Sequence, residues 1–173
     1  MPFSKKSPFS YFLFVICYLL FSLLFCCENP LNNIDAPPLD NHPHRVFERE
    51  VFELTNIERV KHGLAPFIWH EGAAAVARAH SEDMARKNYF DHNSLDGTTF
   101  SERLTRAGVI WRNAAENIAA GYTTPEDVVI GWMNSDGHRK NILGSYTHLG
   151  VGYAYDANSG YKTRITQNFI TPR

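Results

Sequence analysis

The chain has few cysteines, and all of them lie near its beginning. They are Cys17, Cys26 and Cys27, and none occurs after residue 27. The rest of the chain therefore cannot form a disulfide, and no cysteine there can serve as a catalytic nucleophile or a metal ligand. A serine hydrolase has little support as well, because Ser94, which lies close to a histidine, lacks the Gly-x-Ser-x-Gly elbow that exposes such a nucleophile.

An excess of positive charge is also missing. The sequence has 17 Lys and Arg against 18 Asp and Glu, a formal net charge of -1. Residues 1–27 contain Lys5 and Lys6 but no acid, so the remainder carries 15 basic (17 minus 2) against 18 acidic residues, or -3. No basic stripe offsets this balance. The composition therefore predicts no nucleic-acid partner.

A long hydrophobic run occurs once, at the N-terminus. Lys5 and Lys6 precede an apolar run from Phe9 to Phe25, and this order is typical of a secretory signal. We therefore predict that residues 1–27 are a signal peptide or lipoprotein anchor.

The end of this run, Leu23-Leu-Phe-Cys-Cys27, resembles the lipobox of bacterial lipoproteins. The resemblance implies that Cys26 or Cys27 is lipidated and becomes the mature N-terminus, although the preceding residue is not small as in the usual pattern. An uncleaved membrane helix and simple secretion are the alternatives. All three export the domain, and we expect a membrane-anchored protein that faces the cell surface or the periplasm.

The chain then divides into a tether and one domain. Residues 28–44 carry four prolines and no apolar periodicity, which predicts a flexible tether. Residues 45–173 are long enough to form a single domain with its own core.

The domain begins with a helical pattern. Between Val46 and Val60, apolar residues such as Phe47, Val51 and Leu54 recur at three- and four-residue steps. This spacing predicts an amphipathic helix with an apolar face toward the core.

The remaining pattern predicts four more helices and three extended segments. The helices are expected at 71–87, 100–107, 125–132 and 137–143, and the extended segments at 109–120, 147–155 and 162–170. The last two are predicted to form a hairpin. This order favours an α+β layered domain.

The junction between the last two helices, Trp132-Met-Asn-Ser-Asp-Gly-His138, combines a buried aromatic with a helix start. Ser135 or Asp136 can cap the new helix by accepting a hydrogen bond from its free N–H groups. His138 then falls in or near the first turn, where it can face a cleft.

Four blocks of sequence together resemble the CAP superfamily, which comprises cysteine-rich secretory proteins, antigen 5 and class 1 pathogenesis-related proteins. The blocks are Tyr89-Phe-Asp-His-Asn-Ser94, Ala115-Glu-Asn-Ile-Ala119, Trp132-Met-Asn-Ser-Asp-Gly-His138 and Leu149-Gly-Val-Gly152. Their order and spacing resemble those of compact bacterial members with an SCP-like domain, over about residues 46–170. The resemblance implies a three-layer α-β-α sandwich with a central antiparallel sheet and one open cleft.

The same resemblance implies a group of site residues in that cleft. Two histidines and usually two acids converge there in the family. His92 and His138 match the histidines and Glu116 matches the first acid. The second acid is expected where this chain has Asp136 or Ser135, so its identity stays open.

Such a group has a metal-binding interpretation and a structural one. Neutral imidazoles of His92 and His138 can bind zinc and leave positions open for water or substrate, while Glu116 orients a histidine or accepts a proton. Alternatively, Glu116 satisfies buried backbone N–H groups and pairs with His138 as a structural ion pair. Outside this group, His80 is expected to be a packing or surface residue, and Asn117 to hold the local backbone by hydrogen bonding.

Three functions follow as hypotheses. The leading one is a membrane-anchored binding module whose cleft holds an extracellular lipid, glycan or peptide, with or without a divalent cation such as zinc. The alternative is a metal-assisted hydrolase of peptides or cell-wall polymer. The third is a structural or adhesive envelope protein, so whether the chain is an enzyme stays open at this point.

Overall fold

The computed structural model describes residues 44–173 of the chain. The predicted signal or lipid anchor, and all of the predicted tether except His44, lie outside these residues. Among the described residues, no helix combines the length and the apolar character needed to cross a membrane.

Helices and strands are interspersed along the described part of the chain. In order they are α2 (Arg45–Lys61), β1 (Ile68–Trp69), α3 (Glu71–Lys87), α4 (Phe100–Arg106), β2 (Asn113–Ala120), α5 (Pro125–Met133), α6 (Asp136–Ile142), β3 (His148–Tyr155) and β4 (Thr163–Thr171). These bounds confirm the predicted helices to within about two residues. The first extended segment is shorter than predicted, because its regular pairing starts at Asn113.

The four strands form one sheet in the order β1-β3-β4-β2. The three long strands pair antiparallel, β2 with β4 and β3 with β4, as the family resemblance implies. The two-residue strand β1 differs, since it adds to β3 in parallel through Ile68 and Trp69.

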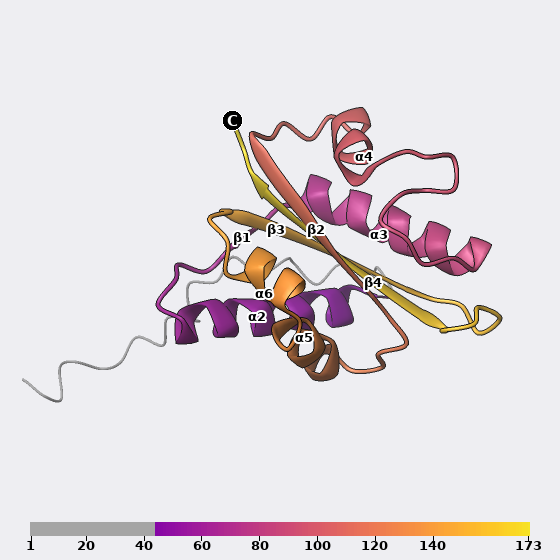
Figure 1. Cartoon of the computed structure of the whole chain (residues 1–173), viewed down its shortest axis with the longest axis horizontal. Coiled ribbons are helices and arrows are strands. Elements are labelled where there is room, and N and C mark those ends of the chain that lie inside the picture. Colours follow the sequence, from indigo (N-terminus) through magenta and orange to yellow (C-terminus); the bar gives the residue numbers. More distant parts are fainter. Residues whose placement is uncertain (1–43) are drawn as a thin grey trace, which may run out of the picture. The chain divides into compact units, whose positions relative to one another are not determined.

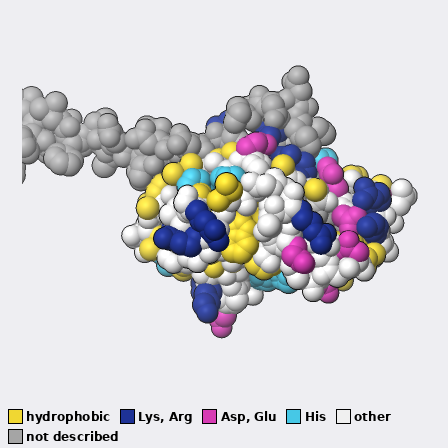
Figure 2. Space-filling model, turned by 90° about the horizontal axis from the view of Figure 1, so that it is seen from above, with side chains coloured by type: hydrophobic (Ala, Val, Ile, Leu, Met, Phe, Trp, Pro, Cys, Tyr) yellow, Lys and Arg dark blue, Asp and Glu magenta, His cyan; other side chains and the backbone are white. Residues whose placement is uncertain are grey.

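Helices cover both faces of this sheet. Helices α3 and α4 lie on one side, and α2, α5 and α6 lie on the other (Figure 1). The α-β-α sandwich is therefore confirmed. On the face seen in Figure 2, basic and acidic side chains are interspersed and do not form one continuous basic stripe.

The Leu149-Gly-Val-Gly152 block has a packing role. Helix α3 crosses β3 so closely that a Cβ atom added to Gly152 would overlap the backbone at Ala77 and Arg78. A Cβ atom on Gly150 would overlap the backbone at Ala73 in the same way. The alanines of α3 and the glycines of β3 together allow this close approach.

The buried face of α2 is more polar than the sequence pattern predicts. Its buried residues are Arg45, Glu48, Val51, Phe52, Thr55, Asn56 and Arg59. The polar members connect the helix to its neighbours: Glu48 accepts two hydrogen bonds from Arg78 of α3, at 2.7 and 2.6 Å. The predicted amphipathic helix is confirmed, and its inner face also buries polar groups because these find partners on other elements.

Candidate functional site

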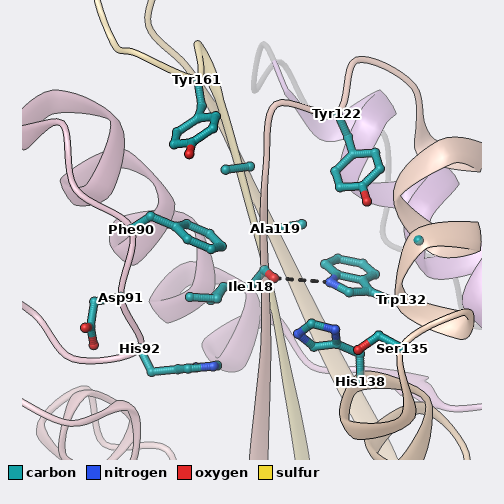
Figure 3. A pocket seen from close by; sticks show the side chains of 12 residues that line it. Phe90, Asp91, His92, Ile118, Ala119, Tyr122, Trp132, Ser135, His138 and Tyr161 are labelled. Atoms are coloured by element: carbon teal, nitrogen blue, oxygen red, sulfur yellow. Dashed lines mark hydrogen bonds between the residues drawn. The ribbon is translucent and has the colours of Figure 1, made fainter.

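A cleft of about 600 Å³ is lined by three main segments and by Tyr161 of the loop between β3 and β4. Phe90 and His92 come from the loop after α3, Ile118 from β2, and Trp132 and His138 from the α5–α6 junction. Figure 3 shows the two histidines on opposite sides of β2. The cleft thus brings together His92 and His138, which lie 46 residues apart in sequence by subtraction of their numbers.

Glu116 does not line the cleft itself but forms a hydrogen bond with His92, which does. The Nδ1 atom of His92 is 2.9 Å from Oε1 of Glu116. The Glu116 side chain is 1% exposed, whereas that of His92 is 51% exposed. A buried carboxylate that accepts from Nδ1 fixes the orientation of the ring.

The second oxygen of Glu116 is also occupied. Arg103 of α4 donates from Nη2 to Oε2 of Glu116 at 2.7 Å. The same guanidinium donates from Nη1 to the backbone oxygen of His92 at 2.9 Å. Arg103 therefore compensates the buried charge and holds the loop that carries the histidine.

Arg103 was not among the site residues predicted from the sequence. A buried glutamate needs a cationic partner, so Glu116 was a signal that one exists. Helix α4 offers both Arg103 and Arg106, and spacing alone does not choose between them.

His80 also holds the loop that carries His92, through a hydrogen bond to the backbone of Asp91. It is 1% exposed, and its Nε2–H donates to the backbone oxygen of Asp91 at 3.0 Å. Burial, and after it the positive charge of Arg103, lowers the pKa of His80. The expected packing role is confirmed, and it acts directly beside His92.

His138 is positioned by an amide network. Asn117 of β2 donates from Nδ2 to the backbone oxygen of His138 at 3.2 Å. Asn141 of α6 donates in turn to Oδ1 of Asn117 at 2.9 Å. This confirms the backbone-holding role predicted for Asn117, and the backbone concerned is that of the cleft histidine.

The two cleft histidines are shifted in opposite directions. The hydrogen bond with Glu116 raises the pKa of His92 above 6.5, against a smaller opposing effect of burial. Burial, followed by the charge of His92, lowers the pKa of His138. An interval of pH therefore exists in which His92 is protonated and His138 is neutral.

The structure places the two candidates for the second acid differently. Ser135 lines the cleft, and as the N-cap residue of α6 its side chain makes no capping hydrogen bond. Asp136 does not line the cleft: its side chain is 93% exposed and pairs with Arg139 at 2.5 Å. The prediction that Asp136 is a cleft residue is therefore wrong, because its position in the first turn of α6 favours an i,i+3 ion pair with Arg139. The expectation that Ser135 or Asp136 caps α6 through its side chain is also wrong.

The structural interpretation of Glu116 is partly right. Glu116 is a member of a buried ion pair, but its partners are Arg103 and His92, and no ion pair joins it to His138.

The metal interpretation depends on two imidazoles. Within residues 44–173, no three His, Cys, Asp or Glu side chains gather where they could hold a metal ion. Both oxygens of Glu116 are committed to neighbours. His92 and His138 by themselves fall short of the three protein ligands usual in catalytic zinc sites.

Relatives in the genus Bacillus share most of this domain. The chain is 51% identical over 108 residues to the Bacillus subtilis uncharacterized protein YkwD, covering 62% of this chain and 42% of that protein. It is 46% identical over 124 residues to the Bacillus subtilis uncharacterized membrane protein YlbC, covering 71% of this chain and 34% of that protein. The chain thus matches less than half the length of either relative.

A solved structure has the same fold. An extracellular protein containing a SCP domain from Bacillus anthracis superposes with a TM-score of 0.66 at 39% identity. The match covers 79% of this chain and 45% of that protein.

The family model agrees with the fold and with the four sequence blocks. The model of the cysteine-rich secretory protein family, CAP, matches residues 52–169, which include all three cleft segments. The chain belongs to the CAP family.

Proposed function

We propose that this chain is an exported CAP-domain protein whose cleft binds an extracellular ligand. The observation that carries the proposal is the fixed pair of histidines in an open cleft of about 600 Å³. Concave sites with a few oriented polar groups among apolar walls are typical of ligand binding. Glu116 orients the ring of His92, and Asn117 holds the backbone of His138.

Export is supported by the relatives and by the N-terminal sequence. The Bacillus anthracis protein is described as extracellular and YlbC as a membrane protein. For this chain we propose attachment to the membrane through a lipid on Cys26 or Cys27. Incorporation of labelled fatty acid into the wild-type chain, and its loss in a C26A/C27A double variant, is the expected result; equal labelling of both would contradict it.

Binding is tested by calorimetry on the full-length chain. The probes are zinc chloride, an N-acetylglucosamine tetramer, an acetylated and amidated hexapeptide, and phosphatidylglycerol vesicles. We expect at least one probe to bind, and its affinity to fall at least about tenfold in His138→Ala. Asp136→Asn is the matched control, because this exposed residue of the same helix lies outside the cleft. No binding by any probe to a folded chain would refute the proposal.

The hydrolase hypothesis has less support. A general base needs a free oxygen within reach of the proton that it abstracts. Both oxygens of Glu116 are engaged, by His92 and Arg103, and its side chain is 1% exposed. Turnover of peptide or murein by the zinc-loaded chain, lost in Glu116→Gln, would favour the hydrolase over the binding module.

A further inference from the structure

The strand β2 forms one edge of the sheet, and its outer side faces the cleft. The sheet order places β2 next to β4 alone. Ile118, Ala119 and Ala120 of this strand line the cleft. An edge strand presents N–H and C=O groups that the sheet itself leaves unpaired.

The register determines which groups these are. In an antiparallel pair, alternate residues point their N–H and C=O toward the partner strand. The N–H of Gly121 donates to the oxygen of Thr163 on the β4 side. Ala120 pairs with Arg164 in the same register. The backbone N–H and C=O groups of Ala119 therefore also point toward β4, and those of Ile118 and Ala120 point toward the cleft.

Side chains already occupy part of this edge. Asn141 donates to the oxygen of Glu116 at 3.3 Å, and Nε1 of Trp132 donates to the oxygen of Ile118 at 3.3 Å. Both bonds come from outside the sheet, in agreement with the register. Within residues 44–173, no acceptor forms a hydrogen bond with the N–H groups of Ile118 and Ala120. The cleft floor therefore offers two aligned donors.

These donors have the repeat of an extended peptide. Two residues of a strand span about 7 Å, which is the distance between alternate carbonyl groups of a second extended chain. A peptide that adds to a sheet edge gains affinity from such main-chain bonds and specificity from pockets for alternate side chains.

An aromatic platform stands beside the edge. Phe90 and Tyr161 have ring centroids 6.4 Å apart and are 45% and 60% exposed. Figure 3 shows both rings on the same side of Ile118, with Tyr122 across from them. Exposed aromatic rings at a cleft suit an apolar side chain of a bound partner.

Polar contacts between two loops hold this platform in place. Oδ1 of Asn88, a residue in the left-handed region at φ 54°, accepts from the N–H of Gly160 at 2.8 Å. Nε of the buried Arg164 donates to the oxygen of Tyr89 at 3.1 Å, and its guanidinium lies 5.1 Å from the ring of Tyr161. The two loops that carry the rings are therefore fixed to each other before any ligand arrives, which reduces the entropy cost of binding.

We propose that the cleft docks an extended peptide along the outer edge of β2. The carbonyl groups of the peptide accept from the N–H groups of Ile118 and Ala120, and an apolar side chain of the peptide packs on Phe90 and Tyr161. This assignment rests on the proposed ligand-binding function and gives its ligand class.

The test uses the 15N-labelled full-length chain and the acetylated, amidated hexapeptide Ala-Leu-Ala-Phe-Ala-Leu. We expect the peptide to shift the amide resonances of Ile118 and Ala120 and to slow their hydrogen exchange. Ala120→Pro removes one donor, and the β2–β4 ladder survives because this N–H faces away from β4. Affinity should fall about five- to tenfold in this variant, the usual effect of one lost hydrogen bond. Asp136→Asn, which lies outside the cleft, should bind within about twofold of wild type.

The outcomes separate the two proposals. If the N-acetylglucosamine tetramer binds at His138 and the peptide does not, the peptide assignment is wrong and the ligand-binding function stands. The peptide assignment is also wrong if the peptide binds without slowing hydrogen exchange at Ile118 and Ala120. This measurement uses the wild-type chain, so it does not depend on the folding of Ala120→Pro. If no probe perturbs any cleft residue, both proposals fail.

Discussion

Glu116 holds His92 and Arg103 at the same time, with one carboxylate oxygen for each. The hydrogen bond with Glu116 raises the pKa of His92, whereas burial lowers the pKa of His138 in the same cleft. The carboxylate is a positioning group in this arrangement, since it is buried and both of its oxygens are engaged.

Glu116→Gln should destabilise the fold. The substitution leaves Arg103, 12% exposed, without its charged partner. Removing one member of a buried pair typically costs about 3–5 kcal/mol, and the retained amide hydrogen bonds should keep the loss near about 3 kcal/mol. Chemical denaturation of the full-length chain measures this. A loss below about 0.5 kcal/mol would show that the pair is not needed for stability.

Proton NMR titration of the metal-free chain should give the two histidines pKa values on opposite sides of 6.5. His92 is expected above and His138 below, for the reasons of hydrogen bonding and burial given above. In Glu116→Gln the pKa of His92 should fall, whereas that of His138 should not fall. A His92 value below 6.5 in the wild type would contradict the geometry.

These shifts also fix the signs of the pH dependence of stability. The contribution of His92 to the free energy of unfolding is complete below its pKa in the unfolded chain, about 6.5. It is lost as the pH rises through the raised pKa in the folded chain. His138 acts in the opposite direction: its contribution is present above about 6.5 and is lost as the pH falls through its lowered pKa. Denaturation curves of His92→Gln and His138→Gln against pH measure each contribution as a difference from wild type.

Gly152→Ala should prevent α3 from packing on β3. The added Cβ would overlap the backbone of Arg78 and Ala77, which cannot move as a flexible side chain would. Overpacking of this kind costs about 3 kcal/mol or more. Gly137→Ala is the matched control, because a Cβ there meets nothing within 4 Å. Equal stability of the two variants, by thermal denaturation, would refute the close-packing argument.

Asp136→Ala should change little. Its ion pair with Arg139 is exposed, and such pairs contribute about 0–1 kcal/mol. Ligand affinity by calorimetry should stay within about twofold of wild type. A loss comparable to that of His138→Ala would restore Asp136 as a cleft residue.

Local signals in the sequence were enough to predict most of the fold. Thr124 and Pro125 mark the start of α5, where the Thr124 hydroxyl accepts from the N–H of Asp127 as a cap. The glycines of β3 that receive α3 were only a sequence motif until the two elements were placed together. A contact between segments that are distant in sequence leaves no periodic signal in either of them.

The histidines and the glutamate of the candidate site could be predicted from the sequence, whereas the contacts that hold them could not. His92, Glu116 and His138 came from the resemblance, whereas Arg103 belongs to no motif and emerges only when α4 is packed beside β2. The Asp136 error has a similar origin, since one position along the first turn of a helix decides whether a side chain faces the cleft or the solvent.

The central claim is that His92 and His138 belong to one ligand-binding cleft, and NMR of the histidine rings under ligand titration tests it most directly. On titration of the full-length chain with a probe that binds, the ring resonances of His92 and His138 should shift together and give the same Kd. The ring resonances of His62 should not shift, because His62 lies at the C-terminal end of α2 and its ring is hydrogen-bonded to the backbone oxygen of Glu58. A bound probe that leaves both cleft histidines unchanged would contradict the claim.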